Sequence, residues 1–161
     1  MSQQNVVIDH LAIAVRDLES SVRFYVDTLG FELKEYRETK GKVTAMLSAV
    51  VVDKGGFSIV LMEGVGPDSQ ITRYVEKYGA GVQHVAFLVD DVEKEVAERT
   101  AAGLEFSTSI IRGQTLKQAF SKRDLNSGMM FEFIERIPGK VGFENNNIQN
   151  LFESLEKTNA Y

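Results

Sequence analysis

The chain has 161 residues, 43% of them hydrophobic and 25% charged, which is ordinary for one globular domain with a buried core. A net charge of −5 argues against nucleic acid as a partner, and the lack of cysteine excludes disulfides and thiolate chemistry. Because no apolar run approaches the ~20 residues of a membrane span and no signal-peptide pattern is present, we expect a cytoplasmic protein without membrane contacts.

The first half of the sequence predicts a strand, a helix and three further strands. Residues 6–15 alternate with a period of two, which places His10 on the same strand face as two alanines. Apolar residues at helical spacing follow and end before Gly30, which is typical of a helix terminus. Three strand-like runs complete this half, at 31–37, 42–53 and 57–63, with turns at Gly41 and at Gly55-Gly56.

The same order of elements returns after a linker, residues 64–80. Within this linker, Pro67-Asp68-Ser69 is a typical helix start. The second half then predicts a strand at 81–89, a helix at 91–102 and strands near 104–111, 115–122 and 129–136. A tail helix over about 146–157 is indicated by the apolar stripe Ile148, Leu151, Phe152 and Leu155, with Asn145 to Asn147 as N-cap candidates.

Two segments, 8–19 and 82–93, match each other, and each holds one of the only two histidines, His10 and His84. One βαβββ unit cannot cover its own curved sheet, whereas two units can do so together. We therefore predict an α+β fold, a single domain over 1–161 built from two tandem βαβββ modules that form one open barrel-like cup, plus a C-terminal helix. The modules span about 6–64 and 81–137.

Strand alternation aims both histidines into the cup, and histidine is the commonest metal-ligating side chain. Glu132 lies in an apolar run, where a buried carboxylate is costly unless a cation or hydrogen bonds satisfy it. Taken singly, such a histidine is more often hydrogen-bonded in a core, and such a glutamate more often faces water. Because the two histidines are symmetry-related, the set of His10, His84 and Glu132 predicts a metal site.

The repeat also places Val60 opposite Glu132 when Glu63 is aligned with Glu135. Since valine cannot ligate a metal, the predicted site has two histidines, one carboxylate and open positions. This is the facial triad of non-haem Fe(II) oxygenases, so Fe(II) is the predicted cofactor, with Mn, Co, Ni or Zn left open.

Seven segments of the chain carry a family resemblance: Ile8-Asp9-His10, Ser48-Ala49-Val50, Ser69-Gln70-Ile71, Gly81-Val82-Gln83-His84, Leu116-Lys117-Gln118-Ala119-Phe120, Phe131-Glu132-Phe133-Ile134-Glu135-Arg136, and the tail from Gly142-Phe143 through Asn147-Ile148 to Leu151-Phe152-Glu153-Ser154. They resemble the vicinal-oxygen-chelate superfamily of glyoxalases, bleomycin-resistance proteins and dioxygenases. Within it, the chain is most similar to the catalytic C-terminal half of 4-hydroxyphenylpyruvate dioxygenase and hydroxymandelate synthase.

The resemblance implies an Fe(II)-dependent dioxygenase that uses O2 to decarboxylate and hydroxylate an arylpyruvate-like 2-oxo acid. It implies iron on His10, His84 and Glu132, and the C-terminal helix as a lid over the cup. The polar residues that it places in catalysis are Gln118, Gln83, Ser48 and Gln70. The residues that it places against the substrate are Val60, Met62, Phe120, Met130, Phe143 and Ile148.

Four of these positions depart from the pattern of the phenylpyruvate dioxygenase, namely Val60, Met62, Met130 and Ile148. They favour benzylic hydroxylation, or a substrate without a phenol, over homogentisate formation. The family's N-terminal half has no counterpart here, so we expect a homodimer.

Three other functions stay open. The segment from Ser69 to His84 also resembles methylmalonyl-CoA epimerase, which predicts a Lewis-acid epimerase or glyoxalase-like lyase, although Val60 replaces that enzyme's fourth ligand. An extradiol catechol dioxygenase shares the triad but needs a further histidine that this chain lacks. A small-molecule binding or drug-resistance module would bind its ligand without turnover.

Overall fold

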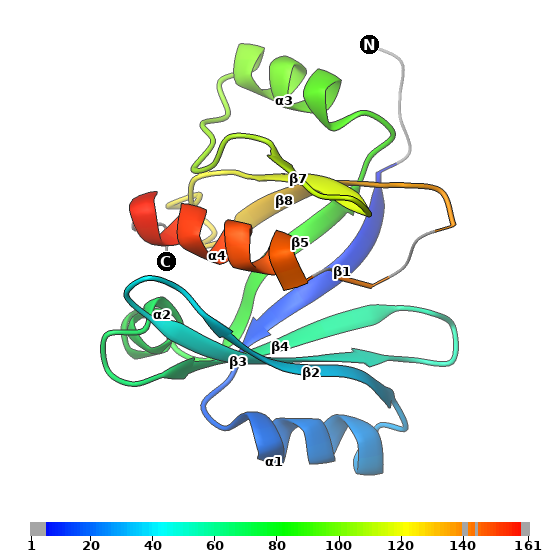
Figure 1. Ribbon diagram of the computed structural model, residues 1–161, viewed down its shortest axis with the longest axis vertical. Coiled ribbons are helices and arrows are strands. Elements are labelled where there is room, and N and C mark those ends of the chain that lie inside the picture. The colour runs from blue at the N-terminus through cyan, green and yellow to red at the C-terminus, as the bar shows by residue number, and fades with distance from the viewer. Residues whose placement is uncertain (1–5, 140–141, 144, 159–161) are drawn as a thin grey trace.

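The computed structural model describes residues 6–139, 142–143 and 145–158, which form one curled sheet with helices on its outer faces and one helix across its open side (Figure 1). The strands are β1 (Val7–Ala14), β2 (Glu32–Lys40), β3 (Ala45–Val52), β4 (Ser58–Val65), β5 (Gly81–Leu88), β6 (Ile111–Arg112), β7 (Leu116–Phe120) and β8 (Met130–Arg136). The helices are α1 (Leu18–Arg23), which continues as the π-helix η1 (Phe24–Thr28), α2 (Gln70–Tyr78), α3 (Val92–Ala101) and α4 (Asn145–Thr158).

The strand order, β2-β3-β4-β1-β5-β8-β7-β6, shows how two similar halves make one sheet. Strand β1 pairs with β4 in parallel, β5 pairs with β8 in parallel, and the antiparallel β1–β5 pair joins the halves. The predicted α+β cup with a C-terminal helix is therefore confirmed. None of the described helices is both long and apolar enough to cross a membrane.

The register of the sheet confirms the internal repeat at the level of single residues. Ala12 on β1 is paired with Val60 on β4, and Ala86 on β5 is paired with Glu132 on β8. Val60 thus occupies, in the first half, the position that Glu132 occupies in the second.

Both outer helices begin in the same way. Asp17 and Asp91 are the N-caps of α1 and α3, and each side chain accepts a hydrogen bond from a backbone N–H three residues on. Glu63 and Glu135, at the ends of β4 and β8, accept from the first backbone N–H of α1 (2.6 Å) and α3 (3.0 Å). These paired contacts fix each helix on the outer face of its own half.

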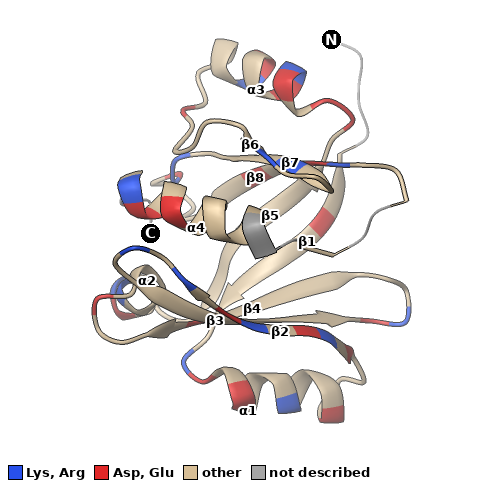
Figure 2. Cartoon of the chain, viewed as in Figure 1, with Lys and Arg blue, Asp and Glu red and all other residues tan. Residues whose placement is uncertain are grey.

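The outer helices bury apolar residues against the sheet and leave charge outside. Leu18, the first residue of α1, and Val92, the first residue of α3, are fully buried. Figure 2 shows acidic and basic residues along α1, α3 and the edge strand β2, whereas β5 carries none, in accord with its central place in the sheet.

One predicted strand is largely absent. Residues 104–111 form only an isolated bridge at Phe106 before the two-residue strand β6. The backbone N–H groups of Ser107 and Thr108 both point to the carbonyl oxygen of Phe120 (2.8 and 3.4 Å), and the Thr108 hydroxyl accepts from the Phe120 N–H (3.0 Å). The Thr108 hydroxyl thus takes the place of a backbone carbonyl oxygen as the acceptor for Phe120. Threonine and serine side chains commonly compete with the backbone in this way.

The predicted tail helix is confirmed as α4, and its N-cap position, residue 144, lies outside the described residues. Its C-terminal half is attached to the β2–β3 turn by Glu156, whose carboxylate accepts from the Thr44 N–H (2.9 Å), the Thr44 hydroxyl (2.6 Å) and the Lys42 N–H (3.2 Å). Gly41 permits this approach, since a Cβ atom there would lie 2.2 Å from a Glu156 oxygen. Helix α4 is therefore held across the cup by the first module.

Candidate metal centre

Three adjacent strands at the centre of the sheet bring His10, His84 and Glu132 together. The Nε2 atoms of His10 and His84 lie 3.2 and 3.4 Å from the same carboxylate oxygen, Oε2 of Glu132. One ligand atom from each residue lies within 4.8 Å of the other two, and all three side chains are buried. The arrangement agrees with the triad that the repeat and the strand alternation predict.

The residue before each histidine orients its ring. His10 Nδ1 lies 2.7 Å from Asp9 Oδ1, and His84 Nδ1 donates to Gln83 Oε1. Because these oxygens only accept hydrogen bonds, each Nδ1 carries a proton and each Nε2 faces the centre of the triad. Metal-ligating histidines generally have such a partner on the second ring nitrogen.

The electrostatics of the triad are asymmetric. Burial would lower the pKa of His10, but the Glu132 and Asp9 carboxylates outweigh it and raise this pKa to about 9. Burial would raise the pKa of Glu132, yet the two imidazoles hold it at about 2. Burial lowers the pKa of His84, whose other neighbour, Gln83, is neutral. In the absence of a metal, His10 is thus cationic, His84 neutral and Glu132 ionised near neutral pH.

The donor set fits a divalent cation. Oε1 of Glu132 is buried and has no hydrogen-bond partner among the described residues, which is costly for a carboxylate. Two imidazole nitrogens and one carboxylate are ligands that iron, manganese, cobalt and zinc accept. Val60 adds no ligand at the position equivalent to Glu132, so the site offers three protein ligands.

A cavity of about 60 Å³ adjoins the triad. Helix α4 contributes Ile148, Leu151 and Phe152 to its lining. Of the residues predicted to contact a substrate or to act in catalysis, the following line this cavity: Ser48, Val60, Met62, Gln118, Phe120, Phe143 and Ile148.

Three other predicted residues lie outside the cavity lining. Gln83 lies beneath His84 and also approaches Met130, whose sulfur is 3.6 Å from its Nε2. Met130 is fully buried and packs against Phe120. Gln70 begins α2, and its buried Oε1 has no hydrogen-bond partner in the described part of the chain.

Five lining residues were not predicted: Arg37, Met46, Val50, Leu151 and Phe152. Met46 and Val50 lie two residues before and after Ser48 on β3, so the two-residue period places all three on one face and could have predicted them. Leu151 and Phe152 belong to the apolar stripe that predicts α4. Arg37 pairs in register with Ser48 on the neighbouring strand, a relation that only the sheet reveals.

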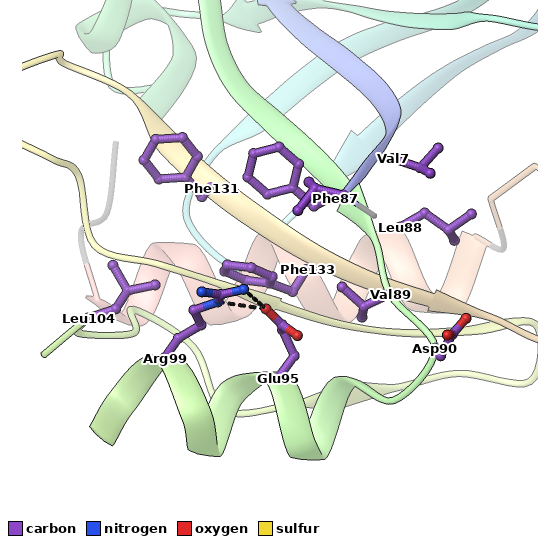
Figure 3. Close-up of a pocket in the computed structure, with 11 residues that line it drawn as sticks. Val7, Phe87, Leu88, Val89, Asp90, Glu95, Arg99, Leu104, Phe131 and Phe133 are labelled. Atoms are coloured by element: carbon purple, nitrogen blue, oxygen red, sulfur yellow. Dashed lines mark hydrogen bonds and ion pairs between the residues drawn. The ribbon is translucent and has the colours of Figure 1, made fainter. Parts of the chain in front are cut away.

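A larger cavity, about 420 Å³, lies away from the triad between α3 and the outer face of the second half (Figure 3). Phe87, Phe131 and Phe133 form its floor, and Glu95 and Arg99 project from α3 toward it. The Arg99 guanidinium donates to the Glu95 carboxylate at 2.5–2.6 Å, so each charge is neutralised by the other. The triad of possible metal ligands lies at the smaller cavity instead.

The sequence model of the Glyoxalase/Bleomycin resistance protein/Dioxygenase superfamily matches residues 7–133, and the chain belongs to this superfamily. The 4-hydroxyphenylpyruvate dioxygenase of Pseudomonas aeruginosa is 27% identical over 93% of this chain and 52% of its own length. A mutant of 4-hydroxymandelate synthase from Streptomyces coelicolor is 25% identical, with a TM-score of 0.84 over 94% of this chain and 55% of that chain. Methylmalonyl-CoA epimerase from Mycobacterium tuberculosis is also 25% identical, with a TM-score of 0.72 over 86% of this chain and 93% of that chain.

The chain spans about half the length of the curated relatives that it matches over nearly all of its own residues. The match to the hydroxymandelate synthase structure covers more of this chain than the match to the epimerase does.

Proposed function

We propose that the protein is an Fe(II)-dependent dioxygenase that decarboxylates and hydroxylates a 2-oxo acid, in the manner of 4-hydroxyphenylpyruvate dioxygenase or hydroxymandelate synthase. The observation that carries this proposal is a buried triad of His10, His84 and Glu132 with Val60 at the equivalent fourth position. Fe(II) held there would supply coordination positions for a 2-oxo acid and for O2. The identity of the metal is part of the proposal.

Two polar side chains beside the triad would orient the substrate. Ser48 on β3 pairs with Met62, and Gln118 on β7 pairs with Ile134, so the two residues occupy equivalent places in the two halves. Both line the cavity, and neither side chain is hydrogen-bonded to another described residue. Their donors and acceptors are thus available to the oxygens of a carboxylate or keto group.

The remaining wall favours an uncharged substrate tail. Apolar side chains from β3, β4, β7 and α4 surround the triad. The charged group at the wall, Arg37, is paired with Glu35 and donates to the carbonyl oxygen of Phe143 (3.2 Å). A monocarboxylate with an apolar, arylpyruvate-like tail matches this lining, and its exclusion of water would protect the reaction.

Gln83 has a different role in this proposal from the one that the resemblance implies. Its carboxamide orients His84 and does not line the cavity. It would act on the metal ligand rather than on the substrate.

A metal-dependent epimerase or lyase is the second candidate, favoured by the TM-score of 0.72 to methylmalonyl-CoA epimerase. This chemistry does not consume oxygen, which separates it from the first candidate. A binding module would retain the ligand unchanged.

The deciding experiment is oxygen uptake by the Fe(II)-loaded protein with a panel of aryl and aliphatic 2-oxo acids, with mass analysis of the products. Uptake coupled to release of carbon dioxide supports the dioxygenase, and the product distinguishes ring from benzylic hydroxylation. Metal binding without uptake contradicts the dioxygenase and favours the second candidate. Glu132→Gln, which keeps the shape of the side chain, is the matched control.

The protein is also proposed to form a homodimer. Val6, Val7 and Ile8 are 62%, 51% and 48% exposed at the start of β1, beside the large outer cavity. Contiguous exposed apolar residues commonly mark an interface. A monomeric mass by light scattering would contradict this proposal.

A further inference from the structure

Arg136, at the end of β8, contacts both β1 and the segment that precedes α4. Its Nε and Nη2 atoms donate to the two carboxylate oxygens of Asp9, at 2.7 and 2.9 Å. Its Nη1 atom donates to the carbonyl oxygen of Gly142 (2.8 Å), and its guanidinium carbon lies 5.1 Å from the ring centroid of Phe143. Bidentate pairs of this kind are strong and geometrically specific.

Two of these contacts lead directly to the metal ligand His10. Asp9 accepts from His10 Nδ1 at 2.7 Å, which sets the direction of Nε2. The ring of Phe143 meets the imidazole of His10 edge-on, with 5.2 Å between centroids. His10 is therefore held by two groups that Arg136 itself holds, and we call Arg136, Asp9, Gly142 and Phe143 the Arg136 network.

Within the described part of the chain, the second histidine, His84, has no equivalent network. Gln83 takes the place of Asp9 beside His84, and the equivalent of Arg136 in the first half is Gly64, as the matching roles of Glu63 and Glu135 indicate. A Cβ atom at Gly64 would lie 2.4 Å from the backbone nitrogen of Thr72, so this position has no room for a side chain. The network is thus specific to one ligand and joins the two halves.

The segment that the network holds covers the cavity. Gly142 and Phe143 precede α4, which closes the cup with Ile148, Leu151 and Phe152. The cavity beside the triad, about 60 Å³, is far below the ~300–1,000 Å³ of typical small-molecule pockets. A substrate of ordinary size therefore needs more room than this cavity gives, and displacement of α4, which supplies three of the lining residues, would provide it. Phe143 lies between α4 and His10, since it precedes the helix and contacts the imidazole.

We propose that Arg136 is a positioning residue that couples closure of α4 to the placement of His10, so that metal binding and closure strengthen each other. Coupling of this kind is reciprocal: a metal that requires an oriented His10 favours the closed helix, and a closed helix raises the affinity for the metal. The inference rests on the proposed function only in that a divalent metal binds the triad.

The test compares the whole chain with and without Co(II), a spectroscopic substitute for Fe(II). Hydrogen–deuterium exchange of α4 measures closure, and competition with a chelator measures metal affinity. In the wild type, Co(II) should slow exchange in α4. In Arg136→Gln, the affinity should fall about 10- to 100-fold, as for other partners of metal-ligating histidines, and Co(II) should no longer slow exchange in α4.

Arg37→Gln is the matched control, because Arg37 holds the same segment from β2 through the carbonyl oxygen of Phe143. In this variant, hydrogen–deuterium exchange in α4 should be faster than in the wild type both with and without Co(II). Addition of Co(II) should still slow it. If Arg136→Gln does not fold, Arg136→Lys retains the charge without the two-pronged contact, and a partial loss of affinity is expected.

Affinity in the Arg136 variants within twofold of the wild type, or an unchanged effect of Co(II) on α4, would overturn the coupling alone. Failure of the wild type to bind any divalent metal at the triad would instead overturn the proposed function. The two failures are thus distinguishable without measuring turnover.

Discussion

Val60 and Glu132 occupy equivalent positions of the two halves, because Val60 pairs with Ala12 as Glu132 pairs with Ala86. The fold thus offers four positions at the candidate metal site, and in this chain His10, His84 and Glu132 place a possible ligand at three of them. The difference between a site with free coordination positions and a more fully coordinated one therefore lies in a single side chain.

Val60→Glu is predicted to fill the fourth position. An added ligand that contributes about 1.4 kcal/mol would tighten metal binding about tenfold, and it would remove a position that oxygen or substrate needs. Metal titration and oxygen uptake measure the two effects. Val60→Leu controls for the change in size, and equal behaviour of the two variants would disprove the equivalence.

Glu132→Ala is predicted to abolish metal retention. The variant removes one of three ligands and leaves His10 and His84 without the carboxylate that both approach. Affinity should fall by more than the about 10- to 100-fold typical of residues that only support a ligand. Metal content after gel filtration is the measurement, with circular dichroism to verify folding, and full metal content in a folded variant would refute the triad.

Metal affinity is predicted to rise with pH. His10 must lose a proton to bind a metal, and its pKa is raised to about 9, whereas Glu132 is already ionised and the pKa of His84 is lowered. Between about pH 6 and pH 8, one proton is released per metal, so affinity should increase about tenfold per pH unit. Co(II) titrations at several pH values test this slope.

Asp9→Asn is the control for the pH dependence. It removes one of the two carboxylates that raise the pKa of His10, so the rise in affinity should level off at a lower pH. A slope that is the same in both proteins, or absent in the wild type, would contradict the assignment of the proton to His10.

Glu156→Ala is predicted to loosen α4 without unfolding the sheet. The carboxylate accepts three hydrogen bonds from Lys42 and Thr44, and loss of such contacts costs about 1–3 kcal/mol. Exchange in α4 should accelerate while exchange in β1 and β5 stays constant. Gly41→Ala, which crowds the same carboxylate, should act in the same direction, and a slower exchange in either variant would count against the anchor.

Several features follow from the order of residues alone. The two-residue period of the strands, the repeat around His10 and His84, and the apolar run around Glu132 together predict the cup and the triad. They do so because backbone geometry converts local spacing into a shared face. The strand expected over 104–111 was wrong because the Thr108 hydroxyl takes the backbone N–H of Phe120 on β7, which depends on how the two segments meet.

The site's surroundings were decided only by tertiary contacts. Asp9 and Arg136 are 127 residues apart, so no local pattern in the sequence indicates that one holds the other. The same is true of Arg37 at the cavity wall and of Glu156 on the β2–β3 turn. The sequence by itself thus determined the class of fold and the three residues of the triad, since both follow from short-range periodicity and internal symmetry. The partner of each ligand and the closure of the cup depend on long-range contacts that exist only when the two halves and α4 come together.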